Sequence, residues 1–169
     1  MMHVVSNIFN ARNWPILALL LSFGLWMGAL GFQYIGNMHP CQMCYWQRHA
    51  HKAVIVISAL ALISRYGLKT DKWNRVFLGL IGLAFLTSFG LAFWHTGVEY
   101  TWWEGPKSCM GGAVTINPAD ILQALEAPVK MPSCGEVPWS MLGLSMAGYN
   151  AILSVGAAFM SFLFAAKAK

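Results

Sequence analysis

Charged residues are scarce in this 169-residue chain, where Asp, Glu, Lys and Arg together make up 10% of the sequence and only six residues are acidic. Soluble domains carry about 25% charged residues, so the composition excludes an ordinary water-soluble fold and favours a protein solvated by lipid. The formal charge is +5, but the basic residues flank apolar runs instead of forming one patch, which excludes a nucleic-acid-binding surface. Internal repeats, low-complexity tracts and a second domain are also missing, so residues 1–169 are predicted to form a single membrane domain.

Long apolar runs take up most of the chain, since 57% of its residues are hydrophobic. Four runs are each long enough for one bilayer crossing at about 20 residues per span; they cover residues 14–35, 45–65, 76–96 and 141–166. The first run is longer than the apolar region of a signal peptide, about 7–15 residues, and lacks a small-x-small cleavage site, so we expect it to stay as a helix. Trp14 and Tyr34 are expected at the membrane interfaces. The predicted fold is an all-α membrane protein, a four-transmembrane-helix bundle.

The distribution of Lys and Arg predicts the orientation of this bundle. Arg12 precedes the first run, four basic residues lie within 65–75, and Lys167 and Lys169 end the chain. Basic residues favour the cytoplasmic side, so both termini and the 65–75 loop are predicted there, with loops 36–44 and 97–140 on the other face. In the longer loop, Asn117 and Pro118 predict the start of a short amphipathic helix, lying either on the membrane or against the loop itself.

All four cysteines fall in or next to these two outer loops, which indicates a compartment where disulfides persist. Cys41 and Cys44 form a Cys-x-x-Cys pair at the expected start of the second helix. The positive end of the helix dipole and the nearby Arg48 favour a thiolate at Cys44. Helical spacing places Arg48 and either His51 or Lys52 on the face of Cys44, an electropositive stripe suited to an electron-rich partner. The competing interpretation is that Arg48 binds lipid phosphates.

Three further interpretations of the cysteines can be weighed. Covalent haem attachment needs a His after the pair, where this chain has Tyr45, and a thioredoxin-like fold needs alternating strands and helices. A zinc site of four cysteines stays open on spacing alone. Cys109 and Cys134 could form a structural disulfide, or could relay oxidising equivalents to the first pair by thiol–disulfide exchange. Asn150, in the fourth run, is expected to make an interhelical hydrogen bond among small residues that allow close packing.

The pattern Pro40-Cys41-x-x-Cys44-x-x-Gln47-Arg48 after a first span resembles the disulfide bond formation protein B (DsbB) family. The resemblance extends over nearly the whole chain through the four spans, the basic inner loop and the long outer loop with two cysteines. The segments His95-Thr96-Gly97-Val98-Glu99, Trp102-Trp103-Glu104-Gly105-Pro106 and Gly143-Leu144-Ser145-Met146-Ala147 resemble one bacterial branch of that family.

This resemblance implies an oxidoreductase of the bacterial inner membrane, with its cysteines in the periplasm, that reoxidises a periplasmic DsbA-type thiol oxidase and passes electrons to the membrane quinone pool. Cys109 and Cys134 would form the outer-loop disulfide, with Cys109 taking the mixed disulfide with the partner. Cys134 would then exchange with Cys41.

Cys44, as a thiolate, would face the quinone (ubiquinone or menaquinone). Arg48 would stabilise the quinone oxygen and the thiolate, His95 would lie near the same pocket, and no metal is expected. Two alternatives remain: a non-enzymatic membrane protein with a four-Cys zinc site, and a vitamin K epoxide reductase-like enzyme. The second is disfavoured because its Cys-x-x-Cys pair usually lies late in the bundle.

Overall fold

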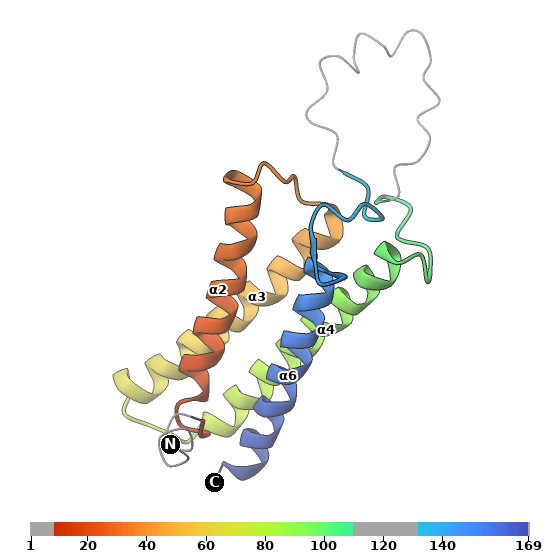
Figure 1. Cartoon of the computed structure of the whole chain (residues 1–169). Helices are drawn as coiled ribbons and strands as arrows, with labels where there is room; N and C mark the ends of the chain where they lie inside the picture. The colour runs from red at the N-terminus through yellow and green to blue at the C-terminus, as the bar shows by residue number, and fades with distance from the viewer. Residues whose placement is uncertain (1–8, 110–131, 169) are drawn as a thin grey trace, which may run out of the picture.

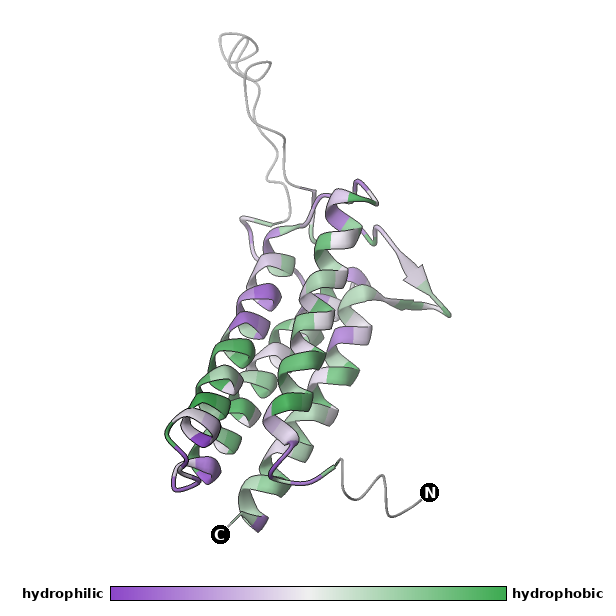
Figure 2. Cartoon of the chain, turned by 90° about the vertical axis from the view of Figure 1, so that its left-hand side faces the viewer, coloured by the Kyte–Doolittle hydropathy of each residue, from purple (hydrophilic) through white to green (hydrophobic). Residues whose placement is uncertain are grey.

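Four long helices form the protein in the computed structural model, which describes residues 9–109 and 132–168. They are α2 (Trp14–Tyr34), α3 (Gln42–Leu62), α4 (Asn74–Glu99) and α6 (Met146–Lys167). A single π-helical turn, η1 (Ile63–Gly67), continues α3. All four are long and apolar enough to cross a membrane, and apolar residues dominate along their length (Figure 2). The predicted fold class, a four-helix membrane bundle, is confirmed.

Local sequence explains where the helices begin. Pro15 occupies the first turn of α2, where its fixed φ suits a helix start. Cys41 caps α3 by accepting from the backbone N–H of Cys44, and Ser145 caps α6 by accepting from that of Gly148. The start of α2, the end of α6 and the connection between α3 and α4 lie together at one end of the bundle, opposite the cysteines (Figure 1).

The bundle is not evenly packed. The most extensive interface joins α4 and α6, while α2 packs mainly on α3 and makes few contacts with α4 or α6. Small buried residues let α6 approach α4 closely; they include Ala147, Ala151, Ser154, Ala157 and Ala158. Val54, Leu78, Ile81 and Phe85 form the apolar centre. The expected role of the small residues of the fourth run is therefore confirmed.

Two predicted helix starts differ from the structure. Helix α6 begins at Met146 instead of residue 141, because a two-residue hairpin precedes it: β1 (Ser140–Met141) pairs with β2 (Leu144–Ser145). Its turn residues Leu142 and Gly143 both have positive φ, 52° and 76°, as a type I′ turn requires. Helix α3 begins three residues earlier than predicted, because Cys41 is its cap.

Trp14 is the first residue of α2 and is buried within the bundle. Its indole Nε1 donates to Ser161 Oγ of α6 across 2.7 Å, so it joins two helices; its place at a membrane interface stays a prediction. Tyr34, at the other end of α2, is exposed as expected. The short helix predicted from Asn117 and Pro118 lies outside the described residues.

Candidate redox site at the start of helix α3

Cys41 and Cys44 lie on the first turn of α3 with their sulfur atoms in direct contact. The Cys41 thiol donates to Cys44 Sγ across 2.9 Å, and Cys41 Sγ accepts from the Cys44 backbone N–H at 3.2 Å. The hydrogen bond to Cys44 and, to a smaller extent, burial raise the pKa of the Cys41 thiol above its ordinary value. The thiol proton therefore stays on Cys41, and Cys44 is the sulfur that receives a hydrogen bond as an anion would.

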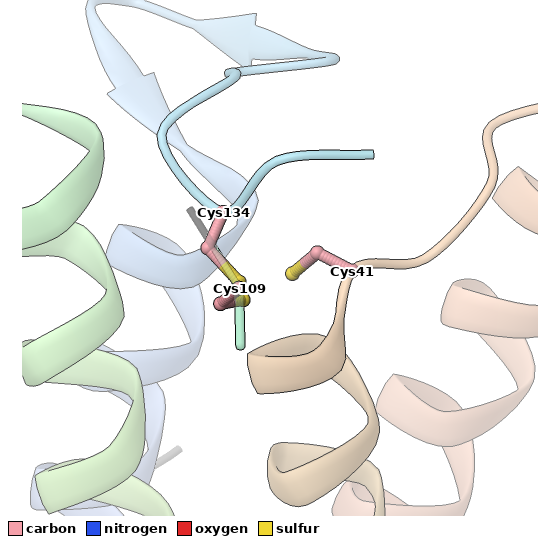
Figure 3. Close-up of side chains that lie close together, drawn as sticks. All are labelled: Cys41, Cys109 and Cys134. Carbon is pink, nitrogen blue, oxygen red and sulfur yellow. A yellow bond between two sulfur atoms is a disulfide. The ribbon is translucent and has the colours of Figure 1, made fainter. Parts of the chain in front are cut away.

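The second cysteine pair lies beside Cys41 of the first. Cys109 and Cys134 form a disulfide, and Cys134 also donates from its backbone N–H to the Cys109 carbonyl at 3.0 Å. The sulfur atoms of Cys41, Cys109 and Cys134 all lie within 4.8 Å of one another, and the Cys41 side chain points toward the disulfide (Figure 3). All three cysteines are buried, together with Met43 and Val98. Cys41 and Cys109 are 68 positions apart in the sequence, yet they lie close enough for thiol–disulfide exchange after a small movement.

After α4 the chain folds back toward this site, and the Trp103 ring packs tightly against Gly97 of the helix. A β-carbon at Gly97 would lie 2.0 Å from the Trp103 ring, so only glycine fits there. Trp103 in turn donates from Nε1 to the Trp94 carbonyl at 2.8 Å. The chain leaves the helix at Glu99, and Cys109 lies six residues after Trp103.

His95, on α4, lies beside the dithiol. Its Nε2 is 3.5 Å from Cys41 Sγ and 3.9 Å from Glu99 Oε1, and its Nδ1 is 2.9 Å from the side-chain nitrogen of Gln47. Glu99 accepts a hydrogen bond from Ser145, the cap of α6. The His95 and Glu99 side chains are almost fully buried. These contacts join the end of α4 and the start of α6 to the beginning of α3.

Arg48 lies one turn below Cys44 and is held from α2. Its guanidinium donates to Gln33 Oε1 and to the Ala29 carbonyl, the latter at 3.1 Å. The predicted stripe is only partly correct: His51 turns into the bundle and bonds Asn150, while the Lys52 ammonium lies 5.5 Å from the centre of the Trp26 ring. Of the predicted stripe, Arg48 is therefore the cation that lies beside Cys44 and lines the site.

A cavity of about 570 Å³ opens beside Cys44. Its wall includes Cys41, Cys44, Arg48 and His95, and it continues along α2 and α6; other lining residues are Gly24, Trp26, Gly28, Phe32, Trp139 and Leu153. The lining is mostly apolar and aromatic, with the polar groups gathered at the cysteine end. Such a space suits a flat apolar ligand with polar atoms at one edge.

Sequence reasoning expected a hydrogen bond from Asn150 but missed the partners that connect these groups. Gln47 and Asn150 bond each other at 2.7 Å, and Glu99 and Gln33 fix His95 and Arg48. The expected interhelical hydrogen bond of Asn150 is confirmed. In the sequence, Gln47 was noted only as part of the motif around Cys41 and Cys44. Asn150 was indicated by being an isolated polar residue within an apolar run.

A zinc site of four cysteines does not fit this structure. Structural zinc sites use four ligands, and a disulfide removes Cys109 and Cys134 as thiolate ligands. Cys41, Cys44 and His95 still place three possible ligand atoms within 4.8 Å of one another. Their mutual hydrogen bonds and the adjoining disulfide match thiol exchange more closely than a closed metal site.

Two adjoining cysteine pairs at one end of four apolar helices define a membrane thiol oxidoreductase. The sequence model described as "Disulfide bond formation protein DsbB" matches residues 11–164. The chain belongs to this family, which makes it a multi-pass inner-membrane protein of disulfide bond formation.

Individual relatives agree with the family match. "Disulfide bond formation protein B" of Azoarcus sp. is 31% identical over 144 residues, covering 83% of this chain and 80% of that protein. Proteins of the same description from Idiomarina loihiensis and Methylobacillus flagellatus are each 27% identical over 163 residues. The alignments cover 88% and 95% of this chain, and 84% and 96% of those proteins. No solved structure matches the chain.

Proposed function

We propose that the protein reoxidises a DsbA-type dithiol oxidase in the periplasm and passes the electrons to a membrane quinone. The observation that carries this proposal is the continuous path of sulfur atoms. It leads from the Cys109–Cys134 disulfide through Cys41 to Cys44, which borders the cavity. A disulfide-forming enzyme needs an electron acceptor, and this path ends where an apolar acceptor from the membrane can bind.

The exchange steps follow from the positions of the sulfur atoms. A partner thiolate attacks Cys109, forming a mixed disulfide and releasing Cys134 as a thiolate. Cys134 then attacks Cys41 of an oxidised Cys41–Cys44 pair and releases Cys44 as a thiolate. When the partner's second thiolate resolves the bond to Cys109, the partner leaves as a disulfide and Cys109 is free as a thiolate. Cys109 then attacks Cys134, which restores the outer disulfide and releases Cys41.

The reduced Cys41–Cys44 pair has two electrons to give up and, with Cys44 as a thiolate, one proton, held on Cys41. When the two electrons pass to a quinone, the pair becomes a disulfide. The quinone takes up the Cys41 proton and one proton from the medium, which replaces one lost by the partner's thiols, and becomes a quinol. The cavity fits a quinone: its apolar walls suit the ring, and the Arg48 guanidinium offers N–H donors for a ring oxygen. Arg48 is anchored by Ala29 and Gln33, so it is already oriented for this contact.

The orientation follows from the basic residues. Arg65 binds Asp71 at 3.2 Å and also the Arg12 carbonyl, which places two basic segments at the end of the bundle opposite the cysteines. With this end in the cytoplasm, the cysteine pairs face the periplasm. The proposal also holds that residues 1–169 act as one membrane domain.

Quinone reduction by a reduced DsbA-type protein tests the proposal. Purified wild-type protein should reduce ubiquinone or menaquinone analogues with one quinol formed per partner disulfide, while Cys44→Ser should lose at least 99% of this rate. Met43→Leu is a matched control, because it conserves side-chain volume beside the cysteine without supplying or removing a thiol. A visible thiolate–quinone charge-transfer band should also disappear in Cys44→Ser. Normal turnover in Cys44→Ser would reject the proposed role of that cysteine.

A further inference from the structure

Buried hydrogen bonds connect Cys41 to the middle of the bundle. His95 lies next to Cys41 Sγ, and its Nδ1 is 2.9 Å from Gln47 Nε2. Gln47 Oε1 accepts from Asn150 Nδ2 at 2.7 Å, and Asn150 Oδ1 lies 2.9 Å from His51 Nε2. The chain of contacts crosses from α4 to α3, then to α6 and back to α3. Gln47, His51 and His95 are all less than 10% exposed, so bulk water does not compete for these contacts.

One backbone carbonyl fixes the direction of these bonds. Gln47 Nε2 also donates to the Met43 carbonyl at 3.3 Å, and a carbonyl can only accept. The amide nitrogen of Gln47 therefore carries the donors on that side, one for Met43 and one for His95. Asn150 is then oriented by Gln47, because the Gln47 Oε1 left on the other side of the amide can only accept and so faces the Asn150 nitrogen at 2.7 Å.

This direction has a consequence for the imidazole of His95. Because Nδ1 accepts from Gln47, that nitrogen carries no proton, and the proton of the neutral ring belongs on Nε2. The groups on that side can accept it, namely Cys41 Sγ at 3.5 Å, Glu99 Oε1 at 3.9 Å and the Cys134 backbone, which also bonds the His95 ring. We propose that Gln47 and Asn150 are positioning residues that keep the ring proton of His95 on Nε2, where it faces Cys41 Sγ.

The proposed arrangement gives Cys41 Sγ two N–H donors, the Cys44 backbone at 3.2 Å and the His95 ring. Donors of this kind stabilise a sulfur that carries negative charge. Under the proposed function, Cys41 carries that charge when Cys109 attacks Cys134: the Cys109–Cys134 bond forms, the Cys134–Cys41 bond breaks, and Cys41 leaves as a thiolate. The position of the ring proton does not depend on the proposed function. The benefit of this position for turnover does rest on the proposed function.

Nitrogen NMR of histidine tests the proton position directly. In full-length reduced protein in lipid nanodiscs, labelled with ¹⁵N-histidine, His95 should show a protonated Nε2 and an unprotonated, hydrogen-bonded Nδ1. Its signals can be assigned by their loss in His95→Gln. Gln47→Met should move the Nδ1 resonance toward that of a nitrogen without a donor, and Asn150→Leu should produce a smaller shift in the same direction.

Ser154→Ala provides the matched control, because it removes one bond to Asn150 but leaves the Asn150–Gln47 and Gln47–His95 bonds in place. It should leave the His95 signals unchanged. A protonated Nδ1 in the wild-type protein would overturn the inference, as would unchanged His95 signals in Gln47→Met. Because this measurement needs no turnover, a wild-type protein with protonated Nε2 but no quinone reduction would reject the proposed function alone.

Reactivity of Cys41 gives a second readout. In a Cys44→Ser background at fixed pH, Gln47→Met should slow alkylation of Cys41 by about tenfold, because the Cys41 thiolate loses a positioned N–H donor. Ser154→Ala in the same background should leave the rate within about twofold. Equal rates in the Gln47→Met and Ser154→Ala proteins would show that the Cys41 sulfur does not sense the Gln47–His95 contact, contrary to the proposal.

Discussion

The sulfur atoms of Cys41 and Cys44 lie 2.9 Å apart, with the Cys41 thiol donating and the Cys44 sulfur accepting. This contact gives the two cysteines different chemistry although they share one helical turn. Cys41 keeps its proton and lies beside the second cysteine pair, while Cys44 borders the cavity. The difference can be measured on the reduced protein.

Alkylation of the dithiol should depend on pH in a characteristic way. The raised pKa of Cys41 means a smaller thiolate fraction at any given pH, so its alkylation should be slow at neutral pH and accelerate only above the range of an ordinary thiol. Peptide mapping after brief treatment with iodoacetamide at pH 7 should find modified Cys44 before modified Cys41. In Cys44→Ser the main hydrogen-bond partner is weakened, and Cys41 should then react at lower pH. An alkylation profile of wild-type Cys41 equal to that of a free cysteine would contradict this assignment.

Arg48 should matter for quinone reduction far more than the neighbouring cation Lys52. Arg48→Met removes the guanidinium donors at the cavity, and loss of one such electrostatic contact at a reacting oxygen costs about 10²–10³ in rate. We expect kcat/KM for quinone to fall about a hundredfold, with the rate of exchange between the partner and Cys109 unchanged in stopped-flow measurements. Lys52→Met, one turn further along α3, should stay within about twofold of the wild type. Equal losses in both variants would argue for a general effect of positive charge.

Gly97→Ala should destabilise the segment that carries Cys109. The added methyl would lie 2.0 Å from the Trp103 ring, so the ring must move and its bond to the Trp94 carbonyl would be lost. Forcing extra atoms into a packed site costs about 1–3 kcal/mol, which should appear as a lower midpoint of thermal unfolding in detergent. Gly90→Ala is the control, because a methyl there meets no atom within 4 Å. A Gly97→Ala protein as stable as Gly90→Ala would show that the ring is not fixed over the helix end.

The proposed orientation predicts opposite labelling of two exposed residues. Leu68 lies at the basic end and Leu142 in the β1–β2 turn, 72% and 94% exposed. In a background where the native cysteines are replaced by serine, a membrane-impermeant maleimide added to spheroplasts should label Leu142→Cys. It should label Leu68→Cys only after the membrane is broken. The reverse pattern would place the cysteine pairs in the cytoplasm and exclude a periplasmic partner.

Hydropathy predicted the four helices, because lipid solvation acts on apolar runs of about 20 residues. The start of α3 was predicted three residues too late, because the cap formed by Cys41 was not anticipated. The hairpin at Leu142 and Gly143 escaped prediction because it lies within an apolar run that resembles a helix. The burial of Trp14 and the inward turn of His51 depend on partners in α6, which no local pattern reveals. The Gln47–Asn150 bond joins residues 103 positions apart, so only the packed bundle identifies it.

Two glycines of α2 leave room in the cavity because they have no side chain. Gly24 and Gly28 both line it, and a β-carbon at either one would meet no protein atom within 4 Å. Larger residues there would narrow the space without disturbing the packing of the bundle. Under the proposed function, the range of quinones that fit the cavity is therefore separable from the sulfur chemistry, which resides on α3 and the loop that contacts it. Substitutions on α2 alone would then change the preference for quinones and leave the cysteines in place.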